Sequence, residues 1–148
     1  MRFSLEVTEA VRGVWPARLP LFFRISATDW VPGGWTDDDS VALVRELQPL
    51  GVDLVDCSSG GNAAHAKIPL GPGYQVPFAE KVRKQTGMPT GAVGLITSAA
   101  QAEEIVGSGK ADMVLLAREF LRDPYFAHHA ATSLGEKPAP PPQYLRAF

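Results

Sequence analysis

An arginine and two glycines stand at positions suited to binding an anion. Gly91 and Gly94 fall within a short apolar run, and a residue without a side chain lets backbone N–H groups approach an anion closely. Arg118 follows the next apolar run at the start of a short helical segment, where its guanidinium can grip a phosphate with two parallel hydrogen bonds. The pattern predicts a phosphate site, and the alternative is that Arg118 pairs with an acidic side chain.

A second arginine lies inside an apolar segment. Arg24 interrupts the run Leu21–Ser26, which has the aromatic and β-branched composition of a strand buried on both faces. A cation in such a strand is costly unless it is paired. Arg24 therefore needs a negatively charged partner, and Asp56 is one candidate.

Alternating strand and helix patterns must position these residues. Apolar residues at helical spacing predict a first helix over Phe3–Trp15 that buries one face. Thr36 with Asp39 is typical of a helix N-cap, and Gly51 is suited to ending that helix. We further expect strands over 21–26, 52–57, 90–95 and 111–116. Helices are expected after Pro77, after Thr97 as the N-cap, over Arg118–Arg122 as a brief turn, and from Asp123 to near Gly135.

This order of elements predicts the α/β fold class. Strands that alternate with helices are typical of right-handed βαβ crossovers and a parallel sheet. Four such units are half of a (β/α)8 TIM barrel, and a small open sheet is the alternative. In such barrels, ligands bind at the carboxyl ends of the strands, and phosphates commonly bind after the last two. Gly94 and Arg118 occupy those places.

Composition narrows the classes of function. The chain has 148 residues and a formal net charge of -2, without a basic cluster, so neither nucleic acid nor a membrane surface is an expected partner. A single cysteine, Cys57, excludes an internal disulfide and is expected to be a small buried hydrophobe. No metal-binding motif is present. We expect one cytoplasmic domain.

Five segments together resemble a known family. In order and spacing they are similar to the C-terminal half of Old Yellow Enzyme-type, FMN-dependent ene-reductases and NADPH dehydrogenases, above all the bacterial branch whose C-terminus carries an arginine. The segments are FRISATDW (23–30), DLVDCSSGG (53–61), PGYQVPFAE (72–80), TGAVG (90–94) and REFLRDPY (118–125). The resemblance implies that residues 1–148 are about four βα units of an FMN-binding TIM barrel, ending in an extended tail over 136–148.

The resemblance also implies roles for individual residues. Arg24 would contact the N1/O2 edge of the flavin, and pairing with Asp56 is the alternative. Ala117 would offer a backbone N–H to the phosphate, although the family usually has glycine there. Ser58 and Ser59 fall in the flavin-facing loop, where small residues usually serve steric needs. The residues implied in FMN binding are Arg24, Gly91, Ala92, Gly94, Ala117 and Arg118.

For the whole family, the implied activity is reduction of the activated C=C bond of an enone, with FMN as cofactor and NADPH as reductant. The family's substrate-binding histidine pair and proton-donating tyrosine precede the matching segments, so we expect no catalytic residue in this chain. Arg146 resembles an arginine that one subunit inserts into its neighbour's active site, and a frayed polar tail is the alternative. Partners would be a complementary N-terminal half or further copies of the chain. The alternative function is a non-catalytic half-barrel that binds FMN or another phosphorylated ligand and completes itself by dimerisation.

Overall fold

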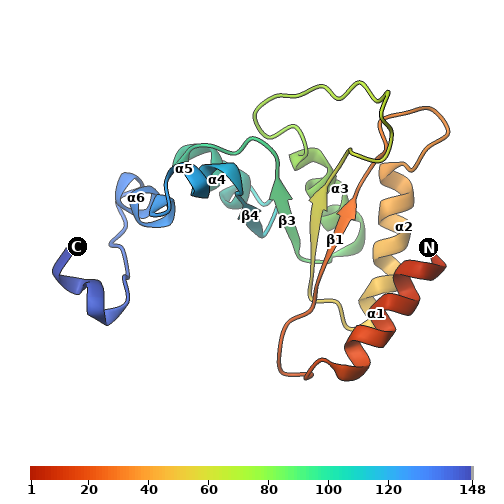
Figure 1. The fold of residues 1–148 in the computed structure, drawn as a ribbon, viewed down its shortest axis with the longest axis horizontal. Coiled ribbons are helices and arrows are strands. Elements are labelled where there is room, and N and C mark those ends of the chain that lie inside the picture. Colours follow the sequence, from red (N-terminus) through yellow and green to blue (C-terminus); the bar gives the residue numbers. More distant parts are fainter. Residues whose placement is uncertain (148) are drawn as a thin grey trace.

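The computed structural model describes residues 1–147. Helices and strands alternate along the chain, as the sequence patterns predict (Figure 1). The elements are α1 (Arg2–Val14), β1 (Phe22–Ser26), α2 (Asp37–Leu47), the 3-10 turn η1 (Gln48–Leu50), β2 (Leu54–Ser58), α3 (Val76–Thr86), β3 (Thr90–Val93), α4 (Ala99–Gly107), β4 (Met113–Leu115), α5 (Arg118–Arg122), α6 (Phe126–Ser133) and the 3-10 segment η2 (Pro142–Ala147).

The four strands form one parallel sheet in the order β1-β2-β3-β4. Arg24 lies opposite Asp56, Asp56 opposite Gly91, and Gly91 opposite Met113, so these four side-chain positions share one face. The arrows of β1, β2 and β3 point the same way in Figure 1, and β4 pairs parallel with β3, so the carboxyl ends of all four strands meet at one edge of the sheet. The predicted α/β pattern with four parallel strands is confirmed.

The core lies between one face of the sheet and the helices α2 and α3. Ile25, Val55, Cys57 and Ala92 alternate with the residues of the other face and are buried against these helices. Burial, and next the neighbouring Asp56 carboxylate, raise the pKa of the Cys57 thiol to about 12. The prediction that Cys57 is a small buried hydrophobe is confirmed.

The other face of the sheet is open, which corrects two expectations about burial. Phe22 is 51% exposed and Arg24 is also exposed, so β1 is covered on one face only. The helix α1 forms where predicted, but its apolar stripe is not buried, since Phe3 is 79% exposed and Val14 is exposed too. Thr8 is the buried residue of α1. Spacing predicts that a helix is amphipathic, whereas burial depends on which elements pack against it.

Local signals at the helix ends are largely confirmed. Thr36 and Asp39 form the predicted capping box of α2, and Gly51 adopts a left-handed conformation after η1. The expectation that Thr97 caps α4 is wrong. The N-cap is Ser98, whose hydroxyl accepts a hydrogen bond from the backbone N–H of Gln101, three residues further on.

The C-terminal part of the chain extends away from the four-stranded sheet (Figure 1). Figure 1 shows α6 and the following segment extending beyond α4 and α5. Within the predicted tail 136–148, residues Pro142–Ala147 form a 3-10 helix rather than an extended segment, with the Tyr144 N–H bonded to the Pro141 carbonyl; Phe148 lies outside the described residues. None of the helices within residues 1–147 is both long and apolar enough to cross a bilayer.

Candidate functional site

A cavity of about 180 Å³ opens at the carboxyl edge of β3 and β4. Three guanidinium groups line it, from β1 and from the two ends of α5, together with the backbone that follows β3. The lining includes Arg24, Ser58, Tyr74, Gln75, Gly94, Leu95, Thr97, Ala117, Arg118, Glu119 and Arg122. The cavity therefore gathers segments from across the chain at the sheet edge where α/β proteins bind their ligands.

Four of the six residues expected to bind the cofactor meet in this cavity: Arg24, Gly94, Ala117 and Arg118. The other two, Gly91 and Ala92, are buried within β3 and do not line it. Ala92 points into the helix-covered core, because neighbouring residues of a strand face opposite sides of the sheet. A Cβ atom at Gly91 would lie 2.3 Å from Cδ1 of Leu115, so this glycine makes room for the neighbouring strand.

Arg24 forms the ion pair that the sequence left as an alternative. Its guanidinium lies 2.6 Å from Oδ2 of Asp56 and donates a second hydrogen bond, of 3.0 Å, to the Ser58 hydroxyl. The Asp56 side chain is only 8% exposed, whereas that of Arg24 is 59% exposed. Because Arg24 also lines the cavity, the ion pair holds this cation in place and leaves part of it facing the open side.

The other two arginines differ in how they are neutralised. Arg122 pairs with Glu119 one turn earlier on α5. Arg118 is exposed, and among residues 1–147 no ion pair is recorded for it. With three arginines and one glutamate in its lining, the cavity favours an anion.

Sequence reasoning missed Arg122. Arg118 and Arg122 are four residues apart, so a helical conformation brings them to the same face of α5. Only Arg118 corresponds to the expected phosphate ligand. The i, i+4 spacing is the signal that could have found Arg122.

The turn after β3 begins with a backbone conformation of positive φ that favours glycine. Gly94 has φ of +124°, and the following Leu95 has φ of +52°. A Cβ atom at Gly94 would lie 2.9 Å from Nε2 of Gln75 and 3.0 Å from the ring of Tyr74. The Gly94 carbonyl accepts a hydrogen bond of 2.9 Å from the Gly73 N–H. Gly94 thus packs directly against the loop that precedes α3.

Arg146 does not lie in this cavity. It belongs to the exposed η2 segment at the C-terminal end of the chain. Ser59 is also outside the lining, although its hydroxyl hydrogen bonds to Gln75 at the cavity wall. Within residues 1–147, no three His, Cys, Asp or Glu side chains are grouped to hold a metal ion.

The fold and the cavity define an α/β protein with a four-stranded parallel sheet and a cationic cavity at the carboxyl edge of its strands. The sequence profile of the NADH:flavin oxidoreductase / NADH oxidase family matches residues 1–137. The chain belongs to this family. The resemblance to flavin-dependent oxidoreductases is confirmed, and the expectation of FMN as cofactor with NADPH as reductant is confirmed at the level of the family.

Curated relatives cover this chain almost completely. The chain is 54% identical over 146 residues to an NADPH dehydrogenase of Geobacillus thermodenitrificans, and the match covers 99% of this chain but 42% of that protein. It is 46% identical over 147 residues to an NADPH dehydrogenase of Bacillus subtilis, covering 99% of this chain and 43% of the relative. The chain therefore spans about two fifths of the length of these relatives.

A solved structure shares the fold. The complex of 2-naphthoyl-CoA reductase with 2-naphthoyl-CoA superposes with a TM-score of 0.77 at 23% identity, over 91% of this chain and 21% of that one. Together with the coverage of the relatives, this likeness confirms the expectation of a partial TIM barrel.

The cavity fits one end of FMN. Pockets that enclose a whole drug-sized ligand have volumes of about 300–1,000 Å³. At about 180 Å³, this cavity is too small for the complete cofactor, but its arginines suit a phosphate group.

Proposed function

We propose that this chain supplies the FMN phosphate-binding part of an Old Yellow Enzyme-type oxidoreductase that reduces the activated C=C bonds of enones. The observation that carries the proposal is the convergence of Arg24, Arg118 and Arg122 on one cavity at the carboxyl edge of the sheet. FMN, when bound, supplies the hydride for such a reduction. What this chain contributes is binding and orientation.

Arg118 is the residue assigned to the phosphate. It is exposed, lines the cavity, and has no recorded ion pair among the described residues, so binding an anion costs it no existing contact. Arg122 is held by Glu119 and adds positive charge from one turn further along α5. Of the two, Arg118 is therefore the better prepared for a new charge-assisted bond.

Arg24 is assigned to the flavin ring system. Its ion pair with Asp56 fixes the guanidinium on the open face of the sheet, where it lines the cavity. A cation held there would stabilise negative charge on a reduced ring. Gly91 and Ala92 then serve the packing of β3 rather than contact with the cofactor.

Binding of FMN can be measured by titrating FMN with the purified chain and following the flavin fluorescence. A charge-assisted hydrogen bond contributes about 1.5–3 kcal/mol, so Arg118→Met should weaken FMN binding by about 10- to 100-fold. Riboflavin lacks the phosphate, and its affinity should not change in this variant. Arg45→Met is the matched control, because Arg45 lies on α2 and bonds the Gln85 carbonyl outside the cavity.

The two candidate functions differ in turnover. Consumption of NADPH in the presence of an enone would support an enzyme, whereas flavin binding without NADPH consumption would favour a non-catalytic half-barrel. A chain that binds neither FMN nor riboflavin would contradict both. Equal affinity for the two flavins would contradict the phosphate site.

We also propose that another polypeptide segment completes the barrel. Each outer strand, β1 and β4, has one neighbour in the sheet, and the apolar side chains of Phe3 on α1 and Phe22 on β1 are exposed. A segment corresponding to the additional length of the relatives would cover them, as would a second copy of this chain. Arg146 would then reach a neighbouring subunit. Light scattering distinguishes a monomer from a dimer, and a monomer with no affinity for the complementary segment would contradict the proposal.

A further inference from the structure

We infer that Gln75 is a positioning residue for the turn that follows β3, held by a hydrogen-bond chain that begins at Trp30. The inference rests on the proposed function in one respect: the turn Gly94–Thr97, which follows β3, lines the proposed phosphate cavity. Gln75 is only 2% exposed, and it precedes α3 directly. A buried amide needs partners for both its oxygen and its nitrogen.

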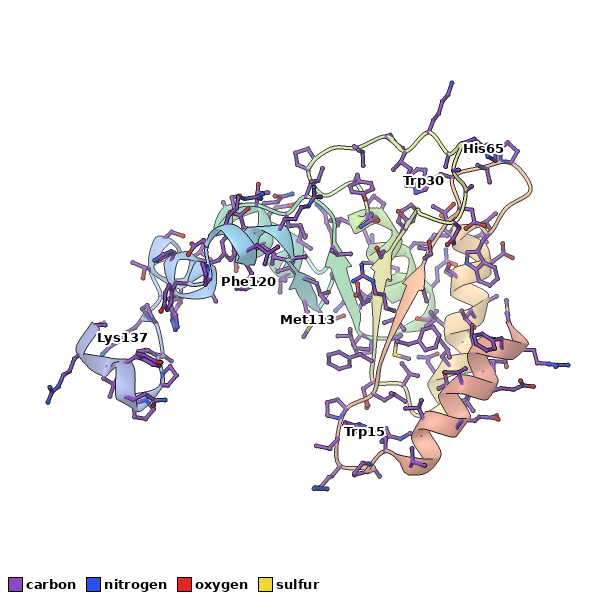
Figure 2. The ribbon with its side chains drawn as sticks, in the orientation of Figure 1. Trp15, Trp30, His65, Met113, Phe120 and Lys137 are labelled. Carbon is purple, nitrogen blue, oxygen red and sulfur yellow. The ribbon has the colours of Figure 1, made fainter. Side chains whose placement is uncertain are left out.

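The hydrogen-bond chain that includes Gln75 links segments at the ends of three different strands. The Trp30 indole N–H donates to the Ser59 hydroxyl at 3.0 Å, and that hydroxyl donates to Oε1 of Gln75 at 2.7 Å. Nε2 of Gln75 donates to the Val93 carbonyl at 3.0 Å. The chain thus runs from the loop after β1, past the end of β2, to the end of β3. Figure 2 shows Trp30 at the edge of the sheet toward which the strand arrows point.

The direction of this chain is set by chemistry. An indole N–H can only donate, so the Ser59 hydroxyl accepts from Trp30 and is left to donate its own proton to Gln75. The Gln75 oxygen is therefore turned toward Ser59, and the amide nitrogen faces the Val93 carbonyl. The Val93 carbonyl can only accept, which fixes the amide nitrogen of Gln75 toward Val93 and leaves the amide oxygen for the Ser59 hydroxyl.

Gln75 also shapes the turn by contact. The hypothetical Cβ atom of Gly94 would lie 2.9 Å from Nε2 of Gln75, so the amide occupies the space beside this residue. The backbone then passes through the left-handed region at Leu95. Such a conformation persists only where surrounding contacts hold it. The hydrogen bond from the Gln75 amide to the Val93 carbonyl holds the residue directly before this turn.

Trp30 is itself held in place. Its ring packs edge-on against Phe78 of α3 at a centroid distance of 5.4 Å, and its backbone φ is +60°. Since Trp30 does not line the cavity, it can affect a ligand there only through other residues. An effect of Trp30 on the cavity would therefore indicate a positioning role of the hydrogen-bond chain, as opposed to direct contact between Gln75 and a ligand.

The inference is tested first without any ligand. Amide hydrogen exchange is compared for residues 94–97 in the wild-type chain and in Gln75→Met, which keeps the length of the side chain and removes both hydrogen bonds. We expect exchange in this turn to become at least about tenfold faster, since one hydrogen bond contributes on the order of a tenfold change in a local opening equilibrium. Exchange in α2 should stay unchanged. The matched control is Gln48→Met, which removes a similar bond, from Nε2 of Gln48 to the Thr86 carbonyl, outside the cavity.

A second variant tests transmission along the chain. Trp30→Phe keeps an aromatic ring against Phe78 but removes the indole N–H, so the Ser59 hydroxyl can rotate away from Gln75. We expect faster exchange in the turn here too, by a smaller factor than in Gln75→Met. Unchanged exchange at residues 94–97 in both variants would overturn the inference. Equal acceleration in the turn and in α2 would also overturn it, because the effect would then be general destabilisation.

Flavin binding then separates this inference from the proposed function. If the wild-type chain binds FMN, both variants should weaken the binding of FMN more than the binding of riboflavin, because the displaced turn lines the phosphate cavity. Equal weakening of the two flavins would overturn the positioning role. If the wild-type chain binds no flavin, the proposed function fails, and the exchange measurement still decides whether Gln75 holds the turn.

Discussion

Replacing Arg24 with methionine tests how much the ion pair on the open face of the sheet contributes to stability. The change keeps a long apolar side chain and removes the guanidinium that lies 2.6 Å from the Asp56 carboxylate. The remaining carboxylate is 8% exposed, and its Oδ1 atom is buried without a hydrogen-bond partner among the described residues. Arg24→Met therefore leaves a buried charge with no cation beside it.

The expected loss of stability follows from the exposed fractions of the Arg24 and Asp56 side chains. Removing one partner from a fully buried ion pair costs about 3–5 kcal/mol, whereas an exposed pair contributes about 0–1 kcal/mol. Here the carboxylate is buried but the arginine is 59% exposed, so water screens part of the interaction. We expect Arg24→Met to lower the free energy of unfolding by about 2 kcal/mol, between these limits.

The assay is urea denaturation at pH 7, followed by far-ultraviolet circular dichroism. The double variant Arg24→Met with Asp56→Leu removes both charges and should regain most of the loss, with a coupling energy of about 1–2 kcal/mol. A loss below about 0.5 kcal/mol for Arg24→Met, a value typical of surface substitutions, would refute the reasoning. So would a double variant that loses the sum of the two single changes.

Three further predictions concern other parts of the chain. Gly94→Ala should destabilise by about 1–3 kcal/mol in urea denaturation because its φ of +124° strains any side chain, whereas Gly91→Ala should cost less because the flexible end of a leucine can move aside. Cys57, whose pKa burial raises to about 12, should resist thiol reagents at pH 8 until urea unfolds the chain. Burial would raise the pKa of Asp112, but hydrogen bonds from Arg83 and from the first N–H of β3, with the Arg83 charge, hold it below its usual value. The ionised Asp112 carboxylate therefore stabilises the fold above about pH 3.9, and this stabilisation is lost as pH falls through the lowered pKa. In Asp112→Asn, the urea midpoint should depend less on pH in that range.

Much of the secondary structure could be predicted because its signals are local. The capping box of Thr36 and Asp39 satisfies backbone groups within one turn, and the left-handed Gly51 needs no distant contact. The alternation of strands with helices was sufficient for a parallel sheet, since parallel strands require crossover connections. The N-cap of α4 was misplaced by one residue because Thr97 and Ser98 are adjacent and both have a hydroxyl that can cap a helix.

Burial could not be predicted in the same way. The spacing of Phe3 and Val14 identifies an apolar stripe on α1, but the stripe is exposed because no described element covers it. The same holds for Phe22, whose apolar character predicted a strand covered on both faces. A sequence pattern reports which face of an element is apolar, and the neighbours of that face are decided by the assembled fold.

The sequence by itself determined the α/β class, the alternation of strands with helices and the candidate residues Arg24, Gly94 and Arg118, because composition and spacing act over a few residues. Only the tertiary structure decided which of them share a cavity. It brought Gln75 to the end of β3 and turned Ala92 toward the helices. The physical reason is that strand register and side-chain alternation are set by pairing between segments far apart in the chain.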